Sequence, residues 1–428
     1  MAAGAEDRVA PARRCAYRVI RRVFEHGAYA DRALHAEAAV LRDPRDRALA
    51  TTLAYGTVQR KRTLDHIVGR LSSRSPAELD PPISAALRLG LFQLAFLNGI
   101  PDHAAVHESV ELAKQESRGG ANLVNAVLRR ATREKAGLTA DLHDDTPQAA
   151  AVMHSVPDWL AEMWWRELGP AETRSLLEHI NHPPESALRV NTLKSPLDLQ
   201  LPVPSHPAPE LPEGRVLEGP FDVFGSDAWQ SGLVMPQARA SMLVARALDP
   251  QPGEVVLDVC AAPGAKTTHL AALMENRGSV TAVEVHPGRA EGLEKTCRRM
   301  GAACVEVVRR DGREVPADQP PYDRVLIDPP CSGLGTLQSR PDLRWQERRA
   351  QLPDLADKQL QLLSSGAAQL KPGGTLVYSV CTISRAEGEE VVERFLTEHE
   401  DFRPDSTRQL LPHRDETDGF FIARLRRD

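Results

Sequence analysis

The stretch that decides the fold is residues 255–267, Val-Val-Leu-Asp-Val-Cys-Ala-Ala-Pro-Gly-Ala-Lys-Thr. A short apolar run, Val255–Val259, leads into a turn of small residues that opens a helix. Such a turn lets a ligand approach the backbone N–H groups closely. The stretch has neither the G-x-G-x-x-G of a dinucleotide fingerprint nor the glycine pattern of a P-loop. It predicts a strand, a nucleotide-type loop and a helix that belong to neither of those classes.

Further short apolar runs alternate with helical stretches after residue 236, which is the pattern of βαβ units in a mostly parallel sheet. The runs that we expect to be strands are Val255–Val259, Val280–Val285, Cys304–Val308, Arg324–Ile327, Thr375–Val380 and Gly419–Leu425. Residues 236–428 are therefore predicted to be a doubly wound α/β domain of the Rossmann-like kind.

The amino-terminal part of the chain has helical periodicity instead. Ile83, Leu87, Leu91 and Leu94 recur at steps of three and four, as one buried helical stripe requires. We predict an all-α bundle over residues 1–135. Between them, residues 136–235 are expected to form a small α+β connecting subdomain, irregular where prolines recur between 196 and 220. A chain of 428 residues exceeds one hydrophobic core, which agrees with three domains.

Composition excludes several classes of protein. With 42% hydrophobic and 26% charged residues, the chain has enough apolar mass to fold. It contains no apolar run of membrane-spanning length and no signal peptide at its start, so we expect a cytoplasmic protein without a membrane partner. The six cysteines are scattered and include no C-x-x-C pair, and the histidines show no ligand spacing. Neither a disulfide framework nor a metal site is predicted.

The net charge of −6 is unevenly distributed, because residues 1–135 carry an excess of Lys and Arg. The cluster Arg13, Arg14, Arg18, Arg21 and Arg22 could attract phosphate, although such clusters are usually solvated helix faces. RNA contact is thus one of two interpretations that the charge pattern leaves open.

Glu284 follows the second strand, about 20 residues beyond Gly264, which is the offset at which a carboxylate commonly accepts hydrogen bonds from ribose hydroxyls. A carboxylate after a strand is more often only a helix cap, so the argument depends on Gly264 and Glu284 together.

Two cysteines carry the strongest chemical signal. Cys331 lies in Asp-Pro-Pro-Cys-Ser-Gly (328–333) after the fourth strand, and Cys381 lies in Tyr-Ser-Val-Cys-Thr (378–382) after the fifth. Neighbouring strands are about 4.8 Å apart, and the carboxyl ends of parallel strands are where such folds bind ligands. We expect both thiols to face one substrate, whereas Cys15, Cys297 and Cys304 are better read as small core residues.

These motifs resemble those of S-adenosylmethionine-dependent RNA (cytosine-5)-methyltransferases. Residues 10–135, with Asp46-Arg47, Tyr55-Gly56 and 122–130, resemble the NusB-type RNA-binding domain. The combination is similar to the bacterial ribosomal RNA enzymes of the Sun/Fmu type, which methylate a cytosine of the small-subunit RNA. The resemblance implies an RNA partner and S-adenosylmethionine as cofactor, and we expect a monomer.

The resemblance also implies a role for each motif residue. Cys381 would be the nucleophile, Cys331 the thiol that assists release, and Asp328 the group that hydrogen-bonds the cytosine edge. The residues that would bind the cofactor are Cys260, Ala261, Ala262, Pro263, Gly264, Ala265, Lys266, Glu284, Asp311 and Asp328. Arg340–Trp345 also matches the family, and its Arg and Trp would either grip RNA or pack a surface loop.

The sequence departs from the family pattern at three positions. Ala265 replaces a second glycine, and a methyl group there could demand a different backbone angle. Val380 replaces a threonine ahead of the nucleophile, and Ala238 follows Gln237 in place of an aspartate. Ala238 puts a supporting contact in doubt.

Two rivals remain. One is an RNA-binding or antitermination-like factor whose catalytic domain has lost its activity. The presence of Cys331, Cys381 and Asp328 argues against this alternative. The other is an enzyme with exchanged roles, in which Cys331 attacks the base as the Pro-Cys thiol of DNA cytosine methyltransferases does.

Overall fold

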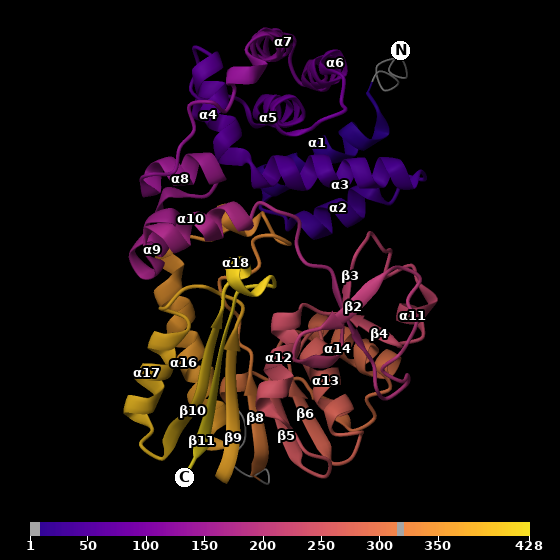
Figure 1. Ribbon diagram of the computed structural model, residues 1–428, viewed down its shortest axis with the longest axis vertical. Helices are drawn as coiled ribbons and strands as arrows, with labels where there is room; N and C mark the ends of the chain where they lie inside the picture. The colour runs from indigo at the N-terminus through magenta and orange to yellow at the C-terminus, as the bar shows by residue number, and fades with distance from the viewer. Residues whose placement is uncertain (1–8, 315–320) are drawn as a thin grey trace. The chain divides into compact units, whose positions relative to one another are not determined.

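The computed structural model describes residues 9–314 and 321–428 (Figure 1). The start of the chain, where no targeting segment is expected, lies partly outside these residues. Within them, the helices are too short or too polar to cross a membrane. The chain divides into two compact units, one of residues 1–182 and 337–349 and the other of residues 183–336 and 350–428. The expected connecting segment 136–235 therefore contributes to both units, and its independence as a domain stays a prediction.

The first unit is helical throughout the described residues. Its helices are α1 (Pro11–His26), α2 (Ala30–Ala38), α3 (Pro44–Gln59), α4 (Lys61–Leu71), α5 (Pro81–Phe96), α6 (Asp102–Lys114), α7 (Arg118–Arg133), α8 (Pro147–His154), α9 (Asp158–Leu168), α10 (Pro170–His179) and the short α15 (Leu343–Gln346). The predicted bundle is confirmed.

Helix α5 is the centre of this bundle. It contacts α1, α3, α4, α6 and α7, and the predicted stripe Ile83, Leu87, Leu91 and Leu94 is buried. The opposite side of the helix is buried too, including Ala85 and Leu89. The stripe was therefore only half of the buried surface, because a helix enclosed by neighbours is apolar all round.

The second unit contains a seven-stranded sheet in the order β10-β11-β9-β8-β5-β6-β7. Its strands are β5 (Val255–Val259), β6 (Ser279–Val283), β7 (Val305–Val308), β8 (Tyr322–Ile327), β9 (Leu370–Val380), β10 (Phe402–Leu410) and β11 (Phe420–Arg427). Strands β5 to β9 pair in parallel, whereas β11 and β10 add antiparallel strands at one edge. The predicted doubly wound α/β fold is confirmed.

Helices cover both faces of this sheet, as Figure 1 shows for the second unit alone. Successive strand residues alternate between two cores: Leu257 and Val259 of β5 pack with α16 (Leu352–Ala368) and α17 (Glu389–Glu398). Val256 packs with α12 (Arg239–Leu248) and α13 (Ala265–Leu273). The continuous apolar runs in the sequence follow from this burial on both faces.

Residues 187–236 hold a small sheet, which agrees with the expected α+β subdomain, although none of its strands was predicted individually. The order is β2-β3-β1-β4, with β1 (Ala187–Val190), β2 (Ser205–Ala208), β3 (Leu211–Leu217) and β4 (Val234–Pro236). Pro207 is accommodated because β2 is an edge strand, where a missing N–H breaks no ladder on the open side. The expectation of an irregular segment at 196–220 was thus wrong for residues 205–217.

Candidate active site

The loop after β5 has the backbone that a closely approached ligand requires. Cys260 has a φ of +65° and Gly264 a φ of +103°. The φ of Gly264 strains any other residue, and a Cβ there would also lie 2.7 Å from Leu293 Cδ1, so glycine is favoured at this position. Gly264 caps the amino terminus of α13, whose free N–H groups face the loop side. The shape of the loop 260–264 therefore depends on the positive φ angles of Cys260 and Gly264.

Asp258, at the end of β5, is a site residue that sequence reasoning missed. One carboxylate oxygen accepts from Thr267 Oγ1 at 2.6 Å, while the other, Oδ1, is buried without a hydrogen-bond partner among the described residues. Burial, reinforced by the nearby Asp328, raises the pKa of Asp258 to about 7. An unpaired buried acceptor is costly, so its presence beside the loop points to a ligand that supplies a donor.

Glu284 and Asp311 follow β6, which pairs with β5, and β7, which pairs with β6 at the edge of the same sheet. Glu284 is buried and accepts from the backbone N–H of His286 at 2.9 Å, with Arg289 at 3.4 Å from its other oxygen. Hydrogen bonds from Arg313 lower the pKa of Asp311 to about 2. Both predicted carboxylates lie at the carboxyl edge of the sheet, and both are held by residues two to five positions further on.

The structure brings the two predicted thiols together. The Sγ atoms of Cys331 and Cys381 are 3.2 Å apart and are not joined as a disulfide. This proximity arises because β8 and β9 are parallel neighbours that end side by side. The hydrogen bond to Cys381 and burial together raise the pKa of Cys331 well above that of a free thiol. Cys331 therefore keeps its proton.

Lys266 and Asp328 form an ion pair beside these thiols. Lys266 Nζ donates to Asp328 Oδ2 at 2.7 Å, and Ser379 Oγ donates to Asp328 Oδ1 at 3.0 Å. Burial opposes the charge of Lys266, but the attraction of Asp328 outweighs it and the pKa of Lys266 is raised. Cys381 also interacts electrostatically with this ammonium group. The site thus combines a thiol pair, a fixed carboxylate and a cation.

Comparisons with known proteins place this site in a family. Residues 245–426 match the family described as 16S rRNA methyltransferase RsmB/F, and residues 10–133 match the NusB family. The probable ribosomal RNA small subunit methyltransferase B of Bacillus subtilis is 36% identical over 408 residues, covering 89% of this chain and 91% of that protein. The chain belongs to the RsmB/F family.

Two further relatives agree with this assignment. The ribosomal RNA small subunit methyltransferase B of Thermus thermophilus is 37% identical to this RsmB/F member, with 90% of this chain and 89% of that protein covered. The crystal structure of PH0851 superposes with a TM-score of 0.83 at 27% identity, covering 98% and 99% of the two chains. The resemblance inferred from the motifs is confirmed.

Two departures of this RsmB/F member from the family pattern are accommodated locally. Ala265 is the first residue of α13 and is not among the residues with positive φ, which are Cys260 and Gly264 in this loop. The predicted need for another backbone angle therefore does not arise. Val380 is fully buried at the end of β9, paired with Phe421 of β11.

The third departure leaves a helix without its own cap. Ala238 is the N-cap residue of α12 and provides no side-chain hydrogen bond. Thr417 Oγ1 accepts from the backbone N–H of Ala240 at 3.2 Å and so caps the helix from a distant part of the chain. Gln237 keeps its own contact, accepting from Arg189 Nε at 2.8 Å. Arg189 in turn donates to Thr268 of α13 at 2.9 Å, which connects β1 to the loop helix.

The segment Arg340–Trp345, which matches the family, lies within the helical unit. Arg344 is fully buried and donates to the carbonyls of Ser155 at 3.1 Å and Ile180 at 2.7 Å. Trp345 Nε1 donates to the Val58 carbonyl at 2.7 Å. Of the two interpretations, packing is correct for Arg344 and Trp345, because both groups are used inside the protein.

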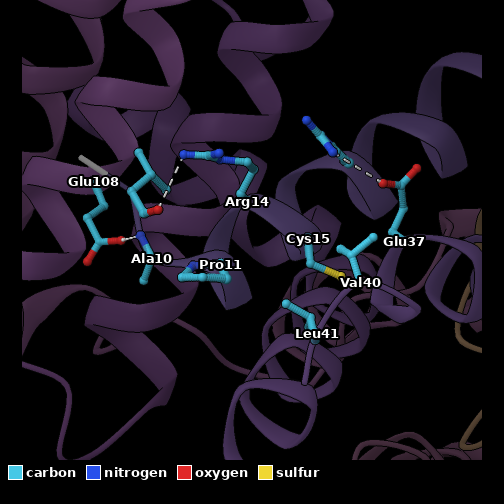
Figure 2. Close-up of a pocket in the computed structure, with 10 residues that line it drawn as sticks. Ala10, Pro11, Arg14, Cys15, Glu37, Val40, Leu41 and Glu108 are labelled. Carbon is cyan, nitrogen blue, oxygen red and sulfur yellow. Dashed lines mark hydrogen bonds and ion pairs between the residues drawn. The ribbon is translucent and has the colours of Figure 1, made fainter. Parts of the chain in front are cut away.

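The arginine cluster of α1 is largely neutralised. Arg13 pairs with Glu108 at 2.9 Å, Arg21 with Glu25 at 2.6 Å, and Arg22 with Glu37 at 3.2 Å. The clustered cations therefore offer less charge to phosphate than the sequence suggested. A cavity of about 410 Å³ lies beside α1 (Figure 2). Its lining includes Arg14 of this cluster and Glu37, the partner of Arg22.

The three remaining predicted core cysteines lie away from any such chemistry. Cys15 borders the cavity of Figure 2, and burial raises its pKa to about 11. Burial likewise raises the pKa of Cys297 to about 12 and that of Cys304. These thiols are protonated apolar groups of the core.

Proposed function

We propose that this RsmB/F member transfers a methyl group from S-adenosylmethionine to carbon 5 of a cytosine in small-subunit ribosomal RNA. The reaction passes through a covalent bond between Cys381 and the base. The observation that carries this proposal is the 3.2 Å separation of the two thiol sulfurs. The names of the relatives from B. subtilis and T. thermophilus support ribosomal RNA as substrate.

The chemistry explains why a thiol is needed. Carbon 5 of cytosine is a poor nucleophile until a thiolate adds at carbon 6, which makes carbon 5 enamine-like. After carbon 5 has taken the methyl group, loss of its proton and expulsion of the thiolate restore the aromatic ring. One sulfur must bond to carbon 6, and a base must remove the proton from the adjacent carbon 5. Two thiols in contact suit both tasks.

The protonation state of Cys331 bears on the roles. The raised pKa of Cys331 keeps its proton in the resting site, which suits the partner role and leaves the attack to Cys381, as the resemblance implies. Once Cys381 is bonded to carbon 6 it is no longer an anion, and the main cause that holds the Cys331 proton is gone. Cys331 can then ionise and accept the carbon-5 proton. This order of events favours Cys381 as nucleophile over the exchanged assignment.

Asp328 is placed to recognise the base. Its carboxylate is oriented by Lys266 and Ser379 and would accept a hydrogen bond from the exocyclic amino group of cytosine. Uracil presents a carbonyl oxygen there, so two acceptors would face each other unpaired, which is strongly unfavourable. Lys266 also supplies the positive charge beside the attacking sulfur.

The residues that would hold S-adenosylmethionine follow the carboxyl edge of the sheet. Residues 260–266 would enclose its methionine part, Glu284 the ribose, and Asp311 the adenine end. The unpaired Oδ1 of Asp258 fits a ligand that carries an ammonium group. When bound, the cofactor supplies the methyl group.

We place RNA contact of the helical unit in a groove of about 840 Å³ between α6 and α7. Its lining includes Lys114, Arg129 and Arg133 together with His103 and Asn122. Cations attract the phosphate backbone, and amide side chains can reach bases. Carboxylates engage Arg13, Arg21 and Arg22 of α1, and Glu111 likewise engages Lys114 of the groove. The choice of this groove therefore depends on Arg129 and Arg133.

Labelled S-adenosylmethionine and small-subunit ribosomal RNA test the proposal. Digestion of the product should yield label in 5-methylcytidine, and the Cys381→Ala variant should yield none. Label in another nucleoside would refute the cytosine-5 assignment. RNA binding without any transferred label would instead identify a binding factor whose methyltransferase domain has lapsed.

A further inference from the structure

Glu387 is a buried carboxylate that no motif assignment uses. It lies in the turn between Cys381 and α17 and has no solvent exposure. Ionised groups without exposure are rare unless a specific set of contacts holds them. Its contacts therefore indicate what it does.

The carboxylate hydrogen-bonds to both cysteine turns. On the first turn, Ser332, next to Cys331, donates its backbone N–H to Oε1 at 2.8 Å and its hydroxyl to Oε2 at 2.5 Å. On the second, Thr382, next to Cys381, donates its hydroxyl to Oε2 at 3.2 Å. The hydroxyls of Ser332 and Thr382 are themselves 2.9 Å apart. One side chain thus bridges the two residues that directly follow the thiols.

Two more side chains fix the carboxylate in place. Gln359 of α16 donates to Glu387 Oε1 at 3.1 Å and to the carbonyl of Pro330 at 3.0 Å, so it reaches the first turn as well. Tyr378 donates its hydroxyl to the backbone carbonyl of Glu387 at 2.6 Å. A carboxylate has about four acceptor sites, and neutral donors from the described residues fill all of them. A fully satisfied buried network of this kind holds one geometry.

We propose that Glu387 is the positioning residue that sets the spacing of Cys331 and Cys381 by clamping their two turns together. The inference rests on the proposed function. In that reaction Cys381 is bonded to carbon 6 of the base, and the release step needs the Cys331 sulfur beside carbon 5. Without the clamp, the two turns keep the hydrogen bond from the Gly335 N–H to the Cys381 carbonyl at 3.0 Å and the contact between the Ser332 and Thr382 hydroxyls. They lose the carboxylate that holds both residues next to the thiols, and the sulfurs move apart.

Spacing of the thiols is measured without RNA by phenylarsine oxide. This trivalent arsenical condenses with two thiols, forming two As–S bonds and releasing one water, and it binds tightly only where both sulfurs are close. We expect Glu387→Ala, and to a lesser degree Glu387→Gln, to weaken arsenical binding at least tenfold. Glu390→Gln, an exposed change of the same charge three residues away, should bind as the wild type does. Wild-type binding by a folded Glu387→Ala protein overturns the proposal.

Coupling to release is measured by a double-variant cycle on the full chain with RNA. Glu387→Gln should slow decay of the protein–RNA adduct by a factor of ten or more, with unchanged affinities for RNA and S-adenosylmethionine. In a Cys331→Ala background the same change should have no further effect, because Glu387 acts through Cys331. If the effects of the two substitutions on the decay rate multiply, or if a loss of activity is matched by a loss of thermal stability, the role of Glu387 is merely structural.

The two experiments separate the two proposals. If the wild type transfers no methyl group, the proposed function fails, and the arsenical result still decides the clamp. Should Glu387→Ala fail to fold, the same binding and decay measurements on Glu387→Gln decide it.

Discussion

At the scale of single residues, the pKa values of three groups at this site are shifted from their ordinary values. Those of Cys331 and Lys266 are raised, so the thiol keeps its proton and the amine keeps its charge, and that of Asp258 is raised to about 7. Perturbed groups of this kind gather where ligands bind or react. Asp258 lies in β5, Lys266 in α13 and Cys331 in the turn after β8, within the motifs that the sequence had singled out.

Asp258 makes stability depend on pH. An aspartate in the unfolded chain releases its proton at about pH 3.9, whereas Asp258 in the folded protein releases it at about 7. The folded state binds more protons between these values, so the free energy of unfolding falls as pH rises through that window. In the wild type this fall in the free energy of unfolding is on the order of 4 kcal/mol. We expect the Asp258→Asn variant to lack it. Urea unfolding at pH 4.5 and 8 measures it; parallel curves for the two proteins would contradict the assignment.

Asp328 tests base recognition. Asp328→Asn replaces an acceptor oxygen by a donor, so the cytosine amino group loses its partner and Lys266 loses its counter-ion. We expect methyl transfer to fall by at least a hundredfold, with S-adenosylmethionine affinity changed much less. Single-turnover rates on RNA and calorimetric binding of the cofactor separate the two effects. An Asn variant with near wild-type transfer rates would exclude Asp328 from the recognition step.

At the scale of elements, helix α12 is capped by a residue far away in sequence. Thr417→Ala removes the acceptor for the Ala240 N–H and should lower the free energy of unfolding by about 1 kcal/mol. Ala238→Asp restores an acceptor at the N-cap itself and should recover most of that loss in the Thr417→Ala background. Denaturant melts of the single and double variants provide the measurement, and a Thr417→Ala protein as stable as the wild type would show that this cap is unimportant.

The elements also show what sequence reasoning could reach. Strands β5, β8 and β9 were predictable because they lie inside the sheet and are largely buried, so that each contains a continuous apolar run. Strand β7 is an edge strand without a fully buried residue, and its valines made it predictable. Strand β10 was missed because it is an edge strand whose residues between Phe402 and Leu410 are mostly exposed. Its sequence therefore resembles a polar loop. The hairpin of β2 and β3 was missed because its prolines predict irregular chain, and an edge position tolerates them.

The candidate site divides in the same way. Cys331, Cys381 and Asp328 could be found because each follows a recognisable strand in a distinctive turn. Glu387 could not, because its importance lies in partners far away in sequence, such as Ser332. The burial of its carboxylate is the signal that could have marked Glu387, and burial is not visible in a single sequence.

At the scale of the whole molecule, the helical unit and the sheet unit carry different tasks in this account. We expect the double variant Arg129→Glu/Arg133→Glu to weaken RNA binding at least tenfold and to flatten its dependence on salt, because fewer phosphates are neutralised. Arg18→Glu/Arg22→Glu on α1 is the matched control and should weaken binding less. Filter binding across a salt series measures both. The opposite ranking would move the RNA surface to α1.

The proposed mechanism requires different roles for the two thiols, and trapping of the protein–RNA adduct distinguishes these roles. Each of Cys331→Ala and Cys381→Ala is incubated with S-adenosylmethionine and RNA and then run on a denaturing gel. Cys331→Ala should give a slowly migrating covalent species that persists, because attack proceeds and release does not. Cys381→Ala should give none and should transfer no methyl group. An adduct formed by Cys381→Ala and absent from Cys331→Ala would reverse the roles and contradict the account.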